Sequence, residues 1–303
     1  MVIEPPPPSQ PDPPVAHDRR GALLADARVR AAGRRPAELL AQWRQDDTVA
    51  PSGVDQRTSV ALDALALEAA PDYDALLLSP VAPLGTASRL APTSQDRTLS
   101  TIRPTEVVSD PTNVLALEAA RRLQEAPGRD ARLCTVHQVL RMQAAPAGEG
   151  HTRHFRLFAI ADAGRARPEH AFEVEAVIAQ LRVHRRVLEL AVERHGARCS
   201  APRAVVRSDR AHDALGERTA VAIARAFSDV DVVRAATESA YYGGFRVEYG
   251  VHDADGSFVG LVDAGRFDWV ALLTSDRRHR FVASAIGVQL LALLLPGAGA
   301  GSR

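Results

Sequence analysis

Hydrophobic residues recur at helical spacing along several stretches of the chain, and the longest stretch runs from Glu173 to His195. Its apolar residues fall on one stripe: Val174, Val177, Ile178, Leu181, Leu188 and Ala191. Gly196 follows the last turn, where glycine commonly ends a helix. His184 interrupts the stripe. We interpret it as a partly buried or helix-edge histidine, because no second histidine or cysteine falls at metal-ligand spacing.

The first part of the chain divides into a tail and a helical extension. Residues 1–16 are rich in proline, which removes backbone donors and favours extended conformation, so a disordered tail is predicted rather than a ligand for an SH3-type domain. Residues 17–57 are predicted to form two helical pieces, broken near Gly33 and Pro36. The arginines of this extension alternate with acidic residues and lack aromatic neighbours, which favours a solvated helix face over nucleic-acid binding.

The main domain is predicted to span residues 58–303 and to begin with a helix that ends at Pro71. Apolar strands are expected from Ala75 to Leu78 and from Thr98 to Pro104. A helix should then run from Asp110, which can cap it, to about Gln124.

Alternating apolar positions predict two antiparallel strands, Arg132–Gln143 and His154–Ile160, joined by a polar loop. After the long helix, a strand is expected near residues 204–207 and a helix near residues 219–227. A strand over residues 241–249 should pair with residues 257–262, and Gly265 and Arg266 should begin a turn before the last strand. Together these patterns predict an α+β domain.

Composition narrows the setting of the protein. The 37 basic and 37 acidic residues cancel, so no overall field attracts nucleic acid or an anionic membrane. Cys134 and Cys199 are too few for a disulfide framework, which fits a reducing compartment. The apolar run from Val288 to Leu295 is too short to span a bilayer. We therefore expect a soluble, cytoplasmic protein without a membrane partner.

Three short motifs follow one another near the C-terminus: Tyr241-Tyr242-Gly243-Gly244, Gly265-Arg266-Phe267-Asp268 and Gly287-Val288-Gln289-Leu290. This order resembles the end of a histidyl-tRNA synthetase-like class II catalytic domain. The helix, strand and proline near residues 58–80 resemble motif 1, and the two strands around Arg141 resemble motif 2. The resemblance covers roughly residues 58–295. It implies an antiparallel sheet flanked by helices and a homodimer formed through motif 1.

The resemblance also implies an amino-acid pocket formed by Asp110, Thr112, Tyr241 and Tyr242. Asp110 and Thr112 match the acid-x-threonine step that contacts the substrate ammonium group, although helix capping alone also explains Asp110. The two tyrosines would line the pocket, but any strand can carry one core ring and one surface ring.

An ATP or phosphate site is implied at Arg141, Gln143, Arg156 and Arg266. Arg141 matches the motif 2 arginine, whose planar charged fork suits phosphate oxygens. Gln143 stands where the family has a glutamate, and Arg266 can instead pair with Asp268. The cofactors implied by an active enzyme are ATP and magnesium, and the residues indicate no resident metal site.

Several residues depart from the family pattern. Leu290, Thr237 and Leu117 stand where arginines are expected. Counting from Phe158, Ile160 and Gly164 replace the pair that grips histidine, and Asp162 is interpreted as an exposed turn acid. No anticodon-binding domain follows within the sequence, so tRNA charging is not expected.

Three functions remain open on these residues. The leading hypothesis is a catalytically degenerate protein that resembles the regulatory subunit of ATP phosphoribosyltransferase, binds a small amino-acid-like ligand and modulates a partner enzyme. The alternative is an ATP-dependent enzyme that activates an amino acid for transfer to a metabolite or carrier. A structural dimer without a ligand is the third. No catalytic residue is assigned under the leading hypothesis.

Overall fold

The computed structural model describes residues 16–144, 152–197, 200–237, 239, 241–252 and 256–293. The predicted proline-rich tail before Ala16, the loop around Gly148 and Cys199 lie outside the described residues.

The core is an eight-stranded sheet in the order β1-β4-β5-β10-β9-β8-β6-β7. The outer pairs β1–β4 and β6–β7 are parallel, and the neighbours between them are antiparallel. The strands are β1 (Asp74–Ala75), β4 (Ala131–Leu140), β5 (His154–Arg165), β6 (Ser200–Ser208), β7 (Asp231–Ala236), β8 (Phe245–His252), β9 (Phe258–Phe267) and β10 (His279–Gly287). A separate small sheet pairs β2 (Val81–Pro83) with β3 (Thr105–Val107).

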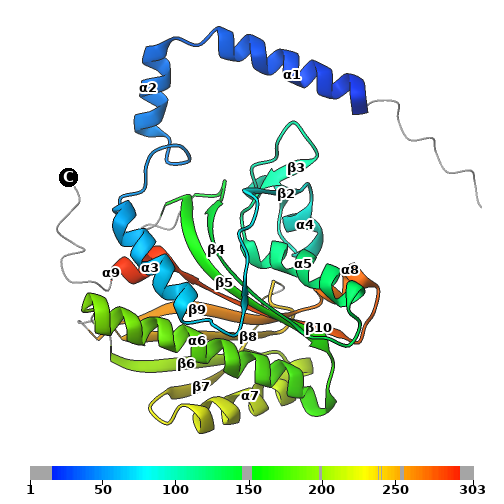
Figure 1. The fold of residues 1–303 in the computed structure, drawn as a ribbon, viewed down its shortest axis with the longest axis vertical. Coiled ribbons are helices and arrows are strands. Elements are labelled where there is room, and N and C mark those ends of the chain that lie inside the picture. The colour runs from blue at the N-terminus through cyan, green and yellow to red at the C-terminus, as the bar shows by residue number, and fades with distance from the viewer. Residues whose placement is uncertain are drawn as a thin grey trace, which may run out of the picture.

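Helices cover both faces of the large sheet (Figure 1). One face packs against α3 (Gln56–Glu68), α6 (Ala171–His195) and α7 (Asp213–Ala226), and the other against α5 (Pro111–Glu125) and α8 (Trp269–Thr274). The remaining helices are α1 (Ala16–Ala32), α2 (Pro36–Gln45), α4 (Thr86–Leu90), α9 (Val288–Leu293) and the short 3₁₀ turns η1 (Gln95–Arg97), η2 (Pro168–His170) and η3 (Arg210–His212). The α+β prediction is confirmed.

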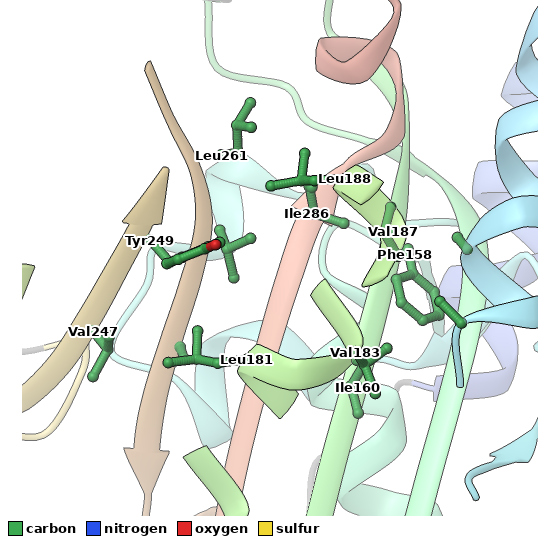
Figure 2. Close-up of a cluster of buried hydrophobic side chains, with 14 of the residues drawn as sticks. Phe158, Ile160, Leu181, Val183, Val187, Leu188, Val247, Tyr249, Leu261 and Ile286 are labelled. Carbon is green, nitrogen blue, oxygen red and sulfur yellow. The ribbon is translucent and has the colours of Figure 1, made fainter. Parts of the chain in front are cut away.

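The main apolar core lies between α6 and the sheet, and its cluster is drawn in Figure 2. Val183 and Val187 of α6 lie beside Ile160 and Phe158 of β5, and all four side chains are buried. Each such side chain contributes roughly 1.5–3 kcal/mol when it leaves water. This packing explains why the α6 stripe is the clearest helical signal in the sequence.

His184 lies fully buried in the same layer. The sequence placed it at the helix edge or only partly inside. Its Nε2 lies 2.7 Å from the Ser284 Oγ on β10, and its ring meets the edge of Phe158. It therefore acts as a core residue.

Asp162 contradicts the prediction of an exposed turn acid. It lies within β5, and only 7% of its surface is exposed. Its carboxylate accepts hydrogen bonds from the Tyr73 hydroxyl at 3.0 Å, the Gln180 amide at 2.7 Å and the Arg132 Nε at 3.2 Å. Burial raises the pKa of Asp162, and these donors oppose that shift. Asp162 thus ties α6 and the chain before β1 to the sheet.

Several element boundaries differ from the sequence expectation. The strand expected at residues 75–78 is reduced to β1, after which only Leu76 continues pairing, through its N–H to the Cys134 carbonyl. Residues 98–104 carry only one isolated bridge, and the strand β3 follows them. Gly265 and Arg266 lie within β9 instead of beginning a turn.

The two N-terminal helices project from the body of the molecule (Figure 1). Their break falls at Gly33 to Arg35, as the sequence predicts. No residue of α2 is buried, and Trp43 remains 51% exposed. The connection to the core is made after α2, where the Ala50 carbonyl lies 2.7 Å from His154 Nε2 and Ser52 accepts from Gln289.

Candidate functional site

A cavity of about 570 Å³ lies over the sheet face that α5 covers. Its volume is in the range of small-molecule sites. The N-terminal turn of α5 forms one side, the ends of β4 and β5 form another, and β8, β9 and β10 form the floor. Six of the eight residues predicted to bind a ligand line it: Asp110, Thr112, Arg141, Gln143, Tyr241 and Tyr242.

Asp110 begins α5 and joins it to the tyrosine pair. Its Oδ1 accepts from the Thr112 N–H at 3.0 Å and from the Thr112 hydroxyl at 2.7 Å, which is the predicted helix cap. Its Oδ2 accepts from the Tyr241 hydroxyl at 2.8 Å. Burial, and then the charge of Asp110, raise the pKa of Tyr241 well above its ordinary value. The phenol therefore keeps its proton and donates a hydrogen bond to the carboxylate.

Residues 241–244 form a turn, and not the start of a strand as predicted. Gly243 and Gly244 adopt φ values of 55° and 83°, which favour glycine. A Cβ at Gly244 would also collide with the Asp209 carboxylate. The turn holds the Tyr241 and Tyr242 rings edge to face, with centroids 5.0 Å apart. Both rings thereby face the cavity.

Arg141 follows β4, as motif 2 requires. Its Nε donates to the Ser109 carbonyl at 3.1 Å, and its guanidinium lies 4.9 Å from the centre of the Phe155 ring. In the described part of the chain it forms no ion pair, so its charge remains available to a ligand.

Two more arginines line the cavity beside Arg141 and were not predicted. Arg97 ends η1 and is exposed. Arg153 forms an ion pair with Asp47 at 2.9 Å, and its Nη1 donates to the Met142 carbonyl at 3.2 Å. No local motif marks either residue, because the segments around residues 94–97 and 152–153 meet only in the folded chain. The three arginines make this side of the cavity suitable for an anion.

The floor changes from apolar to acidic across the sheet. Ala159 pairs with Ala285, Ala285 with Asp263, and Asp263 with Glu248. Both carboxylates line the cavity, and both were missed from the sequence. Arg246 bonds the Asp263 carboxylate through its Nε at 2.7 Å and lies within 4.0 Å of Glu248, so their charge is largely compensated.

Leu290 lies at the end of the floor where α9 begins, and it lines the cavity together with Gln289. Gln289 accepts from the Arg156 N–H at 3.2 Å and donates to the Ser52 hydroxyl at 2.5 Å. This part of the cavity is therefore neutral.

No protein-family model and no curated protein sequence matches the chain. Solved structures do match it. An ATP phosphoribosyltransferase regulatory subunit/histidyl-tRNA synthetase from Bacillus halodurans aligns with a TM-score of 0.56 and 12% identity, over 81% of this chain and 82% of that one. The apo histidyl-tRNA synthetase of S. aureus aligns at 0.55 and 15%, over 82% and 70%.

The RNA binding domain of threonyl-tRNA synthetase from Cryptosporidium parvum aligns with a TM-score of 0.59 and 10% identity, over 80% of this chain and 64% of that one. The chain has the fold of a class II synthetase catalytic domain. At these identities the likeness concerns the fold alone.

Within this class II fold, Arg156 and Arg266 lie away from the cavity lining. Arg156 extends from β5 toward α3, where its Nη2 lies 2.6 Å from the Asp63 carboxylate. Arg266 extends from β9 toward η3, where it bonds Asp268 at 2.6 Å and approaches His212 Nε2 at 3.4 Å. The structure does not bring these two predicted phosphate ligands together with Arg141.

Counting from Phe158 was also wrong, because it selected the face of β5 that is turned away from the cavity. Ile160 packs in the α6 core, and a Cβ at Gly164 would meet Phe172 of that layer. The residues of β5 that line the cavity are Phe155 and Leu157. Leu157, and not Ile160, is therefore the aliphatic residue that this strand presents to the cavity.

Metal and membrane features complete the description. Among the described residues, no three histidine, cysteine, aspartate or glutamate side chains are grouped closely enough to hold a metal ion. The described helices include none that is both long and apolar enough to cross a bilayer. Cys134 is buried, and burial raises the pKa of its thiol to about 11.

Proposed function

We propose that this protein binds a small amino-acid-like ligand in the class II cavity and modulates a partner enzyme, without activating the ligand itself. The observation that carries the proposal is the uneven charge of the cavity. Asp110 and Tyr241 suit an ammonium group, and Arg141 suits an anion, whereas Leu290 supplies no charge at the α9 end.

Adenylation requires positive charge at both ends of the bound triphosphate, because negative charge develops on the reacting phosphoryl group and on the leaving pyrophosphate. Removing one donor that stabilises such charge costs about 2.7–4 kcal/mol, or roughly a hundred- to a thousandfold in rate. Leucine at position 290 and threonine at position 237 are two such losses by comparison with the synthetase motifs. Binding without turnover therefore fits these residues best.

The fit to a nucleotide is partial. Arg97, Arg141 and Arg153 suit a phosphate group. Glu248 and Asp263 are the carboxylates of the floor, but Arg246 already compensates them, so we assign them no magnesium ion. Bound ATP would supply an electrophilic phosphorus, and the three arginines would orient its phosphates.

Amino-acid adenylation is the second candidate, and the three arginines on one side of the cavity are the observation in its favour. Arg97 and Arg153 would have to replace the charge missing at residues 237 and 290. The acceptor would then be a metabolite or a carrier.

The two candidates are separated by ATP–pyrophosphate exchange measured against all twenty amino acids, with Arg141→Ala as the matched control. We expect the protein to give no exchange above the Arg141→Ala background. Thermal shift with the same amino acids should nevertheless identify a ligand, and Asp110→Ala should abolish its shift. Exchange that depends on Arg141 would reject the regulatory proposal and establish an adenylating enzyme.

We also propose a homodimer and a partner enzyme. Leu77 follows the edge strand β1 and is fully exposed in the single chain, and Leu84 and Leu99 nearby in the sequence are also exposed. The Bacillus halodurans protein, an ATP phosphoribosyltransferase regulatory subunit/histidyl-tRNA synthetase, shares the fold and supports the partner proposal. Affinity purification from the native cell should recover the partner, and its activity should respond to the ligand found by thermal shift.

A further inference from the structure

Asn113 is a buried polar residue whose side-chain oxygen has no hydrogen-bond partner in the described part of the chain. It is the third residue of α5, lines the cavity beside Asp110, and is only 3% exposed. Its Oδ1 is buried and unpartnered. A buried acceptor without a donor is unfavourable in the empty protein. A hydrogen-bond donor on a ligand in the cavity would satisfy this acceptor.

Asn113 differs from the other unpartnered buried atoms of the described chain. Gln180, His184 and Thr219 lie in the layer of α6 and α7, away from the cavity. Arg153 lines the cavity, but its guanidinium already pairs with Asp47. Asn113 alone combines burial, a free acceptor and a position on the cavity wall among the described residues.

The groups next to Asn113 are also acceptors. The hydroxyls of Thr112 and Tyr241 both donate to Asp110, so their own oxygen lone pairs remain for a ligand. The carboxylate supplies a negative charge at the same turn. The oxygens of Thr112, Tyr241 and Asn113 can each accept a further hydrogen bond, and they surround one carboxylate. An ammonium group matches this arrangement, because it has three N–H donors and no acceptor.

The part of the floor formed by β5, β10 and α9 carries no charged side chain. Most of its side chains are small or aliphatic: Leu157, Ala283, Ala285 and Leu290. The polar side chains there, Ser284 and Gln289, are already paired, Ser284 with His184 and Gln289 with Ser52 and the Arg156 N–H. On β5 the same face continues through Ala159 and Ala161, so no charged or polar side chain of this strand meets a ligand there. A charged or strongly polar substituent placed on this surface would lose its hydration without compensation.

We propose that the ligand is a primary amine with an uncharged, apolar substituent, and that Asn113 Oδ1 accepts one of its ammonium hydrogens. The inference rests on the proposed function, because it names the ligand class of the same cavity. The ammonium group lies at Asp110, Tyr241 and Asn113, and the substituent lies over Leu157, Ala285 and Leu290.

The test is calorimetric titration of the full chain with leucine, histidine, glutamate and arginine, repeated with Asn113→Leu. This substitution keeps the branched shape of the side chain, makes it larger, and removes both polar atoms. Leucine should bind the native protein most tightly, and Asn113→Leu should weaken its binding about ten- to a hundredfold, as expected for a lost hydrogen bond to a charged group. The melting temperature of the empty variant should stay the same or rise, because an unpartnered acceptor is removed.

The matched control is Thr219→Val, which removes another buried unpartnered oxygen from α7, outside the cavity. It should leave leucine affinity unchanged. If Asn113→Leu fails to fold, Asn113→Ala replaces it in the same titration.

Each other outcome has one meaning. Tighter binding of histidine, glutamate or arginine than of leucine would overturn the ligand class and leave the proposed function standing. Undiminished leucine binding by the Asn113 variants would overturn the role of Asn113. Failure of every amino acid to bind, with leucine methyl ester and isopentylamine also inactive, would remove the proposed function itself.

Discussion

At the scale of single residues, His184 is a neutral histidine enclosed between α6 and β10. Its Nε2 meets Ser284, whereas its buried Nδ1 has no partner among the described residues. Burial lowers the pKa of His184 from 6.5 to about 3. The native protein therefore keeps this imidazole unprotonated under conditions in which the unfolded chain protonates it.

This difference predicts acid sensitivity. Below pH 6.5 the unfolded state binds a proton that the native state does not, so the stability is complete above pH 6.5 and is lost as the pH falls toward 3. Between pH 6.5 and pH 5 the free energy of unfolding should fall by about 2 kcal/mol from His184 alone. Urea unfolding at both pH values, with His184→Gln for comparison, measures it. Equal pH dependence in the two proteins would contradict the assignment.

Residue positions at the cavity were predictable where a short motif carried them. The resemblance to the synthetase motifs pointed to Asp110, Thr112, Arg141 and Tyr241, and all four line the cavity. Asn113 was not, because an asparagine at the start of a helix has an ordinary explanation until its burial and lack of a partner are known. The acidic pair on β8 and β9 was missed because only strand pairing brings it to the cavity, and Arg97 was missed because its turn reaches the end of β4 only in the folded chain.

At the scale of elements, β5 shows why strand faces were harder to predict than strands. Helices cover both faces of the sheet at β5, so its side chains are hydrophobic on both sides and the usual alternation is weak. The position of the strand was predicted correctly. The face that meets the cavity was counted from Phe158, which packs in the α6 core, whereas Phe155 lines the cavity. A shift by an odd number of residues exchanges the two faces, which misplaced Ile160 and Gly164 together.

The two N-terminal helices allow a direct prediction about an element. None of the residues of α2 is buried, and the contacts to the core begin at Asp47, Ala50 and Ser52. Removal of residues 1–45 should therefore change the melting temperature by no more than about 2 °C, because surface changes are usually worth within 0.5 kcal/mol.

Differential scanning calorimetry of this truncated protein and of one lacking only residues 1–16 makes the measurement. A fall of ten degrees in the longer truncation alone would mean that α1 and α2 pack on a core, either their own or that of a second chain.

At the scale of the whole molecule, the order of motifs identified the fold although no single motif did. Helix, edge strand, paired central strands and the tyrosine segment followed in the expected order, and the chain has the class II fold. The helix α8 was not foreseen, because its six residues are too short for a periodic pattern.

The proposed homodimer makes a prediction at this scale. Light scattering should give about twice the chain mass of 32.5 kDa. Leu77→Asp should shift the protein toward the single-chain mass, because a charge would replace a fully exposed leucine beside the edge strand. Leu272→Asp, at an exposed leucine of α8, is the matched control and should leave the mass unchanged. A single-chain mass for the native protein would reject the motif 1 interface.

The placement of α9 has a practical consequence for biosensor design. Gln289 and Leu290 belong to its first turn and line the cavity, whereas α1 and α2 stand clear of the body (Figure 1). Attachment of the protein to a chip through α1 and α2 should therefore leave the cavity undisturbed. A fluorescent reporter fused after α9 is coupled directly to the cavity wall, so its signal should change when a ligand binds.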